Sequence, residues 1–164
     1  MFLPQHKQQS GTRMEHYTDT VMYEIELTSK YIKHMGNRLF NQMGFNITPE
    51  EYIALDTINV YKNICQRDLA KLILKDRAGT GRIIVSLEEK KLVERYVDTK
   101  GNRLVRKMKI TEEGLKVLNT CYVAIKEKGL TPFEKHFSEQ DRQNLKDILK
   151  KFRNVLAEHI EINI

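Results

Sequence analysis

The chain has 164 residues, of which 40% are hydrophobic and 30% are charged, and its formal net charge is +6. This composition is typical of a folded protein, and no apolar run reaches the ~18 residues of a membrane-spanning helix. Two cysteines make no disulfide framework and the N-terminus has no apolar secretory segment, so we expect a cytoplasmic protein without membrane contact. The polar, aperiodic start predicts a flexible tail over residues 1–16.

Two helices are predicted in the first third of the chain. Hydrophobic residues recur near multiples of 3.6 between residues 17 and 43, which indicates a long amphipathic helix that ends at Gly44. The second helix is predicted to run to about Lys62. Its start combines a Thr48 cap, a proline at the first helical position and Glu51 three residues after the cap.

Two shorter helices are predicted next. The first runs from about Gln66 to Leu74 and has Cys65, a poor hydrogen-bond acceptor, in place of a good cap. The second starts after Asp76 and ends near Lys91. The residues expected to face the core are Leu69, Leu72 and Ile73 in the first helix, and Thr80, Ile83, Ile84 and Leu87 in the second.

The pattern then changes to two β-rich segments, 92–98 and 103–110, joined by a turn at 100–102. The second segment has one residue more than the common spacing to Thr111, so we expect a bulge there. Thr111 starts another helix, which Gly129 and Pro132 should interrupt or kink, and Ser138 caps the last helix. The apolar faces of these helices comprise Leu115, Leu118, Tyr122 and Ile125, then Leu145, Ile148, Leu149, Phe152, Leu156 and Ile160.

Positive charge is concentrated in residues 65–109, which contain 13 Lys and Arg against 6 Asp and Glu, a net charge of +7. The rest of the chain therefore has a net charge of −1. A basic module in a nearly neutral scaffold is what a polyanion-binding protein needs, because each neutralised phosphate releases condensed counterions.

The order of these elements is a helix–turn–helix followed by a two-stranded wing, and it resembles the MarR family of bacterial transcriptional regulators over residues 18–160. The resemblance implies a mainly α fold with a small β-wing (α+β). In it, 45–111 form a winged helix–turn–helix DNA-binding lobe, and 17–44 and 112–164 form a helical dimerisation region. Five motifs carry the resemblance: TPEEYIAL (48–55), QRDLAKLI (66–73), the frame 76–95, the Asp98…Arg103 wing and ITEEG (110–114).

The resemblance further implies that the helix after Asp76 enters the DNA major groove and that the wing tip reaches the minor groove. An arginine fork fits guanine O6 and N7, so Arg77 or Arg82 could read a base or hold a phosphate. Arg103 is the minor-groove candidate, and Asp98 should pair with a wing arginine. The candidate DNA contacts on exposed positions are Arg77, Ala78, Gly79, Gly81, Arg82, Ser86, Lys100, Asn102 and Arg103.

Two glycines and two cysteines admit alternative interpretations. Gly79 and Gly81 either permit a close backbone approach to DNA or mark a frayed helix start. Cys65, near a helix N-terminus that favours a thiolate, is a candidate redox site, whereas Cys121 should be a small buried hydrophobe. No cysteine or histidine spacing indicates a metal site, and we expect no cofactor.

Together these observations predict a homodimeric, sequence-specific regulator of transcription that binds a pseudo-palindromic site in double-stranded DNA and has no enzymatic activity. We expect a repressor released by a small aromatic or phenolic effector, in a mostly apolar cavity where the first, second and fifth helices meet. The ligand-binding residues are unknown from sequence. One alternative is a winged-helix module that binds a protein or RNA partner without direct gene regulation. Another is a small enzyme that uses Cys65 or Cys121.

Overall fold

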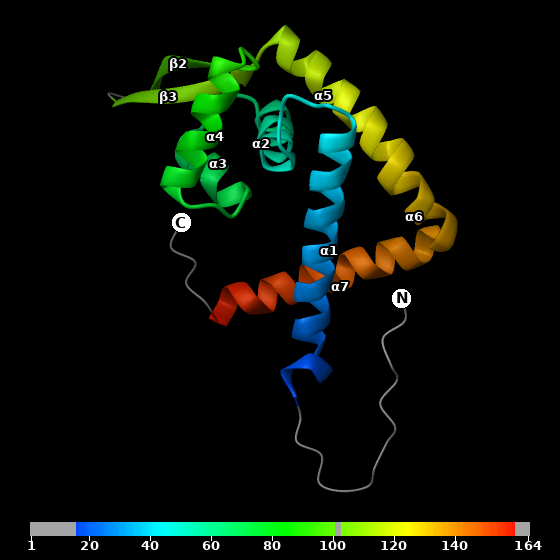
Figure 1. Cartoon of the computed structure of the whole chain (residues 1–164). Coiled ribbons are helices and arrows are strands. Elements are labelled where there is room, and N and C mark those ends of the chain that lie inside the picture. Colours follow the sequence, from blue (N-terminus) through cyan, green and yellow to red (C-terminus); the bar gives the residue numbers. More distant parts are fainter. Residues whose placement is uncertain (1–15, 101–102, 160–164) are drawn as a thin grey trace, which may run out of the picture. The chain divides into compact units, whose positions relative to one another are not determined.

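The computed structural model describes residues 16–100 and 103–159 (Figure 1). The chain divides into two compact units, Met1–Gly36 and Asn37–Ile164. Of the tail predicted over residues 1–16, only His16 is among the described residues, and it precedes a 3-10 turn, η1 (Tyr17–Asp19). None of the described helices has the length and apolarity that crossing a membrane requires.

The first two long helices begin and end close to the predicted positions. Helix α1 (Val21–Gln42) is followed by Gly44 with a φ of +65°, the left-handed conformation that glycine adopts at helix ends. Helix α2 (Pro49–Val60) has the predicted capping box. The Thr48 hydroxyl accepts the Glu51 N–H at 3.1 Å, and the Glu51 carboxylate accepts the Thr48 N–H at 2.7 Å.

Helices α3 (Gln66–Leu72) and α4 (Arg77–Glu89) form the helix–turn–helix. The expected burial of Leu72 is wrong, because its side chain is 46% exposed. The inner face of α3 instead runs through Leu69, Ala70 and the half-buried Ile73, an i, i+1, i+4 spacing. In α4 the predicted core residues are confirmed: Thr80, Ile83, Ile84 and Leu87 are all buried.

A three-stranded antiparallel sheet in the order β1-β3-β2 completes the wing. Strands β2 (Val93–Lys100) and β3 (Arg103–Ile110) pair without interruption from Val93↔Ile110 to Lys100↔Arg103, so the predicted bulge is wrong. Strand β1 (Ile64–Cys65) was not predicted, because two residues are too few to show an alternating pattern. It pairs with β3 through Ile64↔Met108 and Cys65↔Lys107.

The C-terminal helices are α5 (Glu112–Ile125), α6 (Thr131–His136) and α7 (Glu139–His159). The predicted interruption is a π-helical segment, η2 (Lys126–Leu130), between α5 and α6. The predicted apolar face of α5 is buried only in part in the single chain. Leu118 is buried, but Leu115 and Tyr122 are exposed, and Cys121 and Ala124 are buried in their place.

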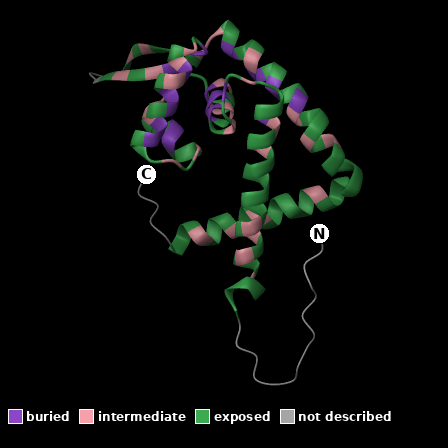
Figure 2. Ribbon diagram, viewed as in Figure 1, coloured by how far each residue is buried: buried purple, intermediate pink, exposed green. Residues whose placement is uncertain are grey.

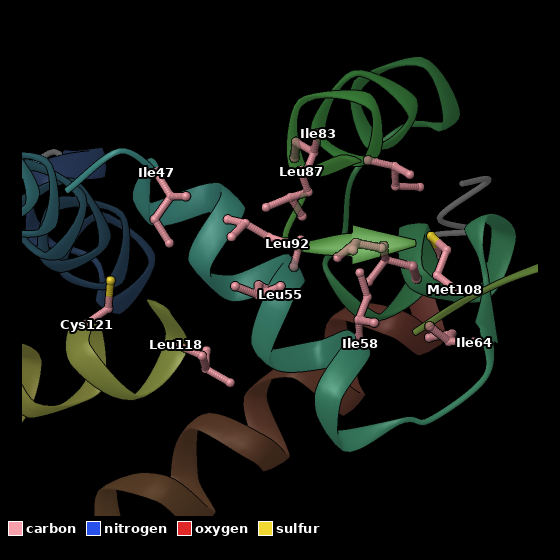
Figure 3. Close-up of a cluster of buried hydrophobic side chains, with 14 of the residues drawn as sticks. Ile47, Leu55, Ile58, Ile64, Ile83, Leu87, Leu92, Met108, Leu118 and Cys121 are labelled. Atoms are coloured by element: carbon pink, nitrogen blue, oxygen red, sulfur yellow. The ribbon is translucent and has the colours of Figure 1, made fainter. Parts of the chain in front are cut away.

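The hydrophobic core lies among α2, α3, α4, the sheet and α5, as Figures 2 and 3 show. Leu55 and Ile58 from α2, Leu87 from α4 and Met108 from β3 are almost fully buried there. By contrast, α7 contains no buried residue, although its apolar side chains recur along one stripe. The core therefore fixes the lobe that carries α4 and the wing, whereas the stripe of α7 remains uncovered in the single chain.

Candidate nucleic-acid interface

The outer surface of α4 is the side of the helix that faces away from the core. Arg77, Ala78, Arg82 and Val85 are exposed there. Gly79 does not belong to this surface, and its expected exposure is wrong. It is buried because its N–H donates to the capping carboxylate of Asp76 at 2.6 Å, and the Lys75 side chain covers it.

The half-buried Gly81 makes room for a side chain of the preceding helix. The Gln66 amide nitrogen donates to the backbone carbonyl of Arg77 at 3.0 Å. A Cβ at Gly81 would lie 3.2 Å from that nitrogen. Neither interpretation of the two glycines made from sequence describes this arrangement, since α4 begins with a capped turn and Gly81 packs against α3.

Ser86, a candidate DNA contact, donates its hydroxyl to the Glu51 carboxylate at 2.5 Å. The Lys90 ammonium donates to both oxygens of the same carboxylate, at 2.8 and 2.9 Å. Burial alone would raise the pKa of Glu51, but the hydrogen bonds from Lys90, Ser86 and the Thr48 backbone hold it below its ordinary value. One side chain of α2 thus fixes the C-terminal half of α4. The capping motif indicated Glu51, but nothing local indicated its partners in α4.

The wing ends at the register pair Lys100↔Arg103, and Asn102 lies outside the described residues. Asp98 was expected to pair with an arginine and instead pairs with Lys107, at 2.5 Å. Asp98 lies opposite Val105, so Lys107 is its diagonal neighbour on the same face of the hairpin. The Lys107 ammonium lowers the pKa of Asp98, and the carboxylate raises the pKa of Lys107.

Ion pairs divide the basic residues of 65–109 into two groups. Described acidic side chains pair with Arg67, Lys75, Lys90, Arg95, Lys107 and Lys109. No such pair involves Lys71, Arg77, Arg82, Lys91 or Arg106 within the described residues. The cations that form no ion pair within the described residues therefore include both arginines on the outer surface of α4 and one arginine of β3.

The two cysteines lie in different environments. The half-buried Cys65 thiol donates to the Asp68 carboxylate at 3.1 Å, which lowers the pKa of Asp68. Cys121 is fully buried, which confirms that it is a core residue, and burial raises the pKa of its thiol to about 11. The redox role of Cys65 stays a prediction. Within the described residues, no cluster of three or more His, Cys, Asp or Glu could hold a metal ion.

A groove of about 380 Å³ lies between the α1–α2 connection, the α4–β2 connection and α5. It differs from the predicted cavity, because none of its lining residues belongs to α2 and its rim is charged. Its apolar walls are Phe45, Ile47, Leu92 and Val117, and its polar side chains are Asn46, Lys90, Glu113, Lys116 and Thr120.

The chain was compared with known protein families, curated proteins and solved structures. No family model matches the sequence, and no curated protein is significantly similar to it. Among solved structures, a complex of Staphylococcus aureus MepR with DNA has a TM-score of 0.71 and 24% identity, covering 86% of this chain and 99% of MepR. The transcriptional regulator SlyA has a TM-score of 0.71 and 24% identity, covering 85% of this chain and 95% of its own.

Wild-type MarR from E. coli, in its apo form, is similar at a TM-score of 0.66 and 20% identity, covering 81% of this chain and 96% of MarR. The three likenesses extend over most of both chains. The resemblance indicated by the sequence motifs is thereby confirmed at the level of the fold: the chain has the winged-helix fold of the MarR-family regulators.

Proposed function

We propose that this protein is a homodimeric transcriptional regulator that binds double-stranded DNA sequence-specifically and acts as a repressor. The observation that carries the proposal is the pair of exposed arginines on the outer surface of α4, Arg77 and Arg82, which form no ion pair with an acidic side chain among the described residues. The fold likeness to MepR, which has been solved with DNA, supports the choice of duplex DNA over other polyanions.

Helix α4 has the dimensions that the major groove admits, since 13 residues make a rod about 20 Å long. Arg77 or Arg82 would meet guanine O6 and N7 with the guanidinium fork, and Ala78 and Val85 offer apolar contacts for a thymine methyl group. Lys100, Asn102 and Arg103 are the proposed minor-groove contacts at the end of the hairpin. Gly79, Gly81 and Ser86 are not among the proposed DNA contacts, because they pack or form hydrogen bonds inside the lobe.

The proposed homodimer follows from apolar side chains that the single chain leaves uncovered. In α7, Ile148 is 64% exposed and Leu145 is 44% exposed, while Leu149 and Phe152 are half-buried. In α1, Val21 is 69% exposed. A 21-residue amphipathic helix without a buried residue needs a partner for its apolar stripe, and a second copy supplies one with the same pattern.

Sedimentation velocity of the full chain, alone and with a fluorescent duplex, tests the proposal. We expect a dimer at micromolar concentration, two chains per duplex, and an affinity that falls steeply as salt rises. A monomer that does not bind duplex DNA would contradict the proposal. That result would favour the alternative of a module for a protein or RNA partner.

Release by a small aromatic or phenolic effector is the finer part of the proposal. The groove beside α5 supports an effector site, because four apolar side chains line it together with Lys90 and Lys116. Lys90 also holds Glu51, so an anion bound to Lys90 would compete with the contact that fixes α4.

A benzoate series added to the protein–duplex complex tests this part. A coupled ligand should lower the duplex affinity roughly 5- to 150-fold, the usual range for linked sites. The Lys116→Met variant should bind duplex DNA normally and respond less to benzoate. If no acid of the series weakens duplex binding, the protein binds DNA constitutively and the effector part is wrong.

A further inference from the structure

Three arginines from three separate elements line one hollow of about 420 Å³. Arg67 lies in the first turn of α3, Arg77 is the first residue of α4, and Arg106 lies in β3. The remaining lining residues are Cys65, Gln66 and Val105. The hollow therefore lies where the helix–turn–helix meets the wing, within one compact unit of the chain.

The charge in this hollow is poorly neutralised. Arg67 has an acidic partner, Asp68, at 3.5 Å, and both side chains are exposed, so solvent weakens the pair. Arg77 and Arg106 have no ion pair within the described residues. The neighbouring cations differ, since Lys75 pairs with Glu50 and Lys107 pairs with Asp98. Like charges around one hollow repel each other, and an anion that accepts hydrogen bonds from several guanidinium groups removes that repulsion.

The framework around the hollow is held in place by contacts that do not use these guanidinium groups. Gln66 donates to the Arg77 carbonyl at 3.0 Å and so ties the start of α4 to α3. The absence of a side chain at Gly81 leaves room for that amide. Strand β1 pairs Cys65 with Lys107, the residue next to Arg106. The backbones that carry the three arginines are therefore fixed relative to one another before any ligand binds.

The hollow lies between α4 and the hairpin, and this position indicates which anion would bind there. In duplex DNA, the sugar–phosphate backbone is the ridge that separates the major groove from the minor groove. If α4 occupies one groove and the wing enters the next, the surface between them must face that ridge. Planar guanidinium forks match phosphate oxygens better than ammonium groups do.

We propose that the hollow between α3, α4 and β3 binds one backbone phosphate of duplex DNA, held jointly by Arg77 and Arg106 with Arg67 at its edge. This inference rests on the proposed function and adds to it a phosphate-binding site that bridges the helix–turn–helix and the wing. It changes the role of Arg77 from a base reader to a phosphate ligand and leaves Arg82 as the proposed base reader.

The test uses the full chain, a cognate duplex selected from random sequences, and the variants Arg77→Ala, Arg106→Ala and the double variant. Each single variant should bind roughly tenfold more weakly and lower the logarithmic salt slope by about 0.9, the value for one phosphate. The double variant should lose little more than one single variant, since both arginines hold the same phosphate. Lys71→Ala is the matched control, because it removes an exposed cation of α3 that does not line the hollow.

A methylphosphonate scan of the duplex identifies the phosphate. Neutralising one phosphate on each half-site should weaken duplex binding by wild type. On that neutralised duplex, Arg77→Ala and Arg106→Ala should cause no further loss of affinity, whereas Arg82→Ala should still weaken binding. Variants that bind like wild type, or two arginines that depend on different phosphates, would overturn the inference and leave the proposed function intact. A different result would assign the hollow to free phosphate instead. In that case inorganic phosphate at constant ionic strength would inhibit duplex binding by wild type but not by Arg106→Ala, and no position of the methylphosphonate scan would respond. If wild-type protein binds no duplex, the inference falls together with the proposed function.

Discussion

Replacing Gly114 with alanine is expected to lower the free energy of unfolding by about 3 kcal/mol or more. A Cβ at this buried position would lie 2.2 Å from the Leu92 carbonyl oxygen and 2.7 Å from Cγ1 of Ile110. The carbonyl cannot easily move, because it accepts the Thr111 N–H at 3.0 Å. Overpacking a core against backbone costs more than overpacking against a flexible side chain, so the loss should lie at or above the upper end of the usual 1–3 kcal/mol.

Gly81→Ala is the matched control, since it makes the same substitution at a helical glycine of α4. Its Cβ would meet only the end of the Gln66 side chain, at 3.2 Å, and alanine favours a helix by about 1 kcal/mol over glycine. We expect a change within about 1 kcal/mol of wild type. Urea unfolding followed by circular dichroism, at equal protein concentration because dimers are stabilised by mass action, compares the two variants. Equal losses would show that α5 does not pack against Leu92 as closely as described.

Local sequence signals predicted the parts of the fold that local interactions determine. Thr48, Asp76 and Thr111 each accept a backbone N–H three residues later, a contact that depends on residue type and spacing alone. The core residues of α4 followed from a 3.6-residue period for the same reason. These capped, periodic segments gave the order of elements on which the family resemblance rests.

Contacts between distant residues explain the predictions that were wrong. The exposure of Leu72 depends on how α3 packs against α4, and the partner of Asp98 depends on the hairpin register. Strand β1 exists only because β3, more than 35 residues later, offers it an edge. The buried face of α5 is set in the same way, because Cys121 and Ala124 face the core that α2 provides.

In the candidate site, too, local patterns were predicted from sequence and contacts between distant residues were not. The helix period placed Arg77 and Arg82 on the outer surface of α4, and the structure agrees. No sequence pattern could bring Arg106 beside Arg77, since their elements meet only in the folded lobe. Likewise, Ser86 was assigned to the surface because its bond to Glu51 spans 35 residues. Sequence reasoning therefore identified the helix that carries the candidate site, but not the internal contacts that position it.

Glu51 is the internal contact whose loss should have the second large effect. Its side chain is 6% exposed, completes the cap of α2, and accepts hydrogen bonds from Ser86 and Lys90 of α4. In Glu51→Gln, an amide NH₂ would replace one carboxylate oxygen and leave Lys90 without a charged partner. Because Lys90 is partly exposed and can turn to water, we expect a loss of about 2–3 kcal/mol at pH 7, below the range for fully buried pairs.

The pH dependence separates the charge of Glu51 from its shape. The pKa of Glu51 is lowered in the folded protein, so its ionised form stabilises the fold above the ordinary value of about 4.5, and this contribution is lost as the pH falls through the folded pKa. The stability difference between wild type and Glu51→Gln should therefore be full at pH 7 and shrink as the pH falls below about 4.5. Glu50→Gln, next to it, breaks an exposed pair with Lys75 and should cost less than about 1 kcal/mol. A Glu51→Gln loss that stays constant from pH 7 to pH 3.5 would mean that packing, and not the ionised carboxylate, joins α2 to α4.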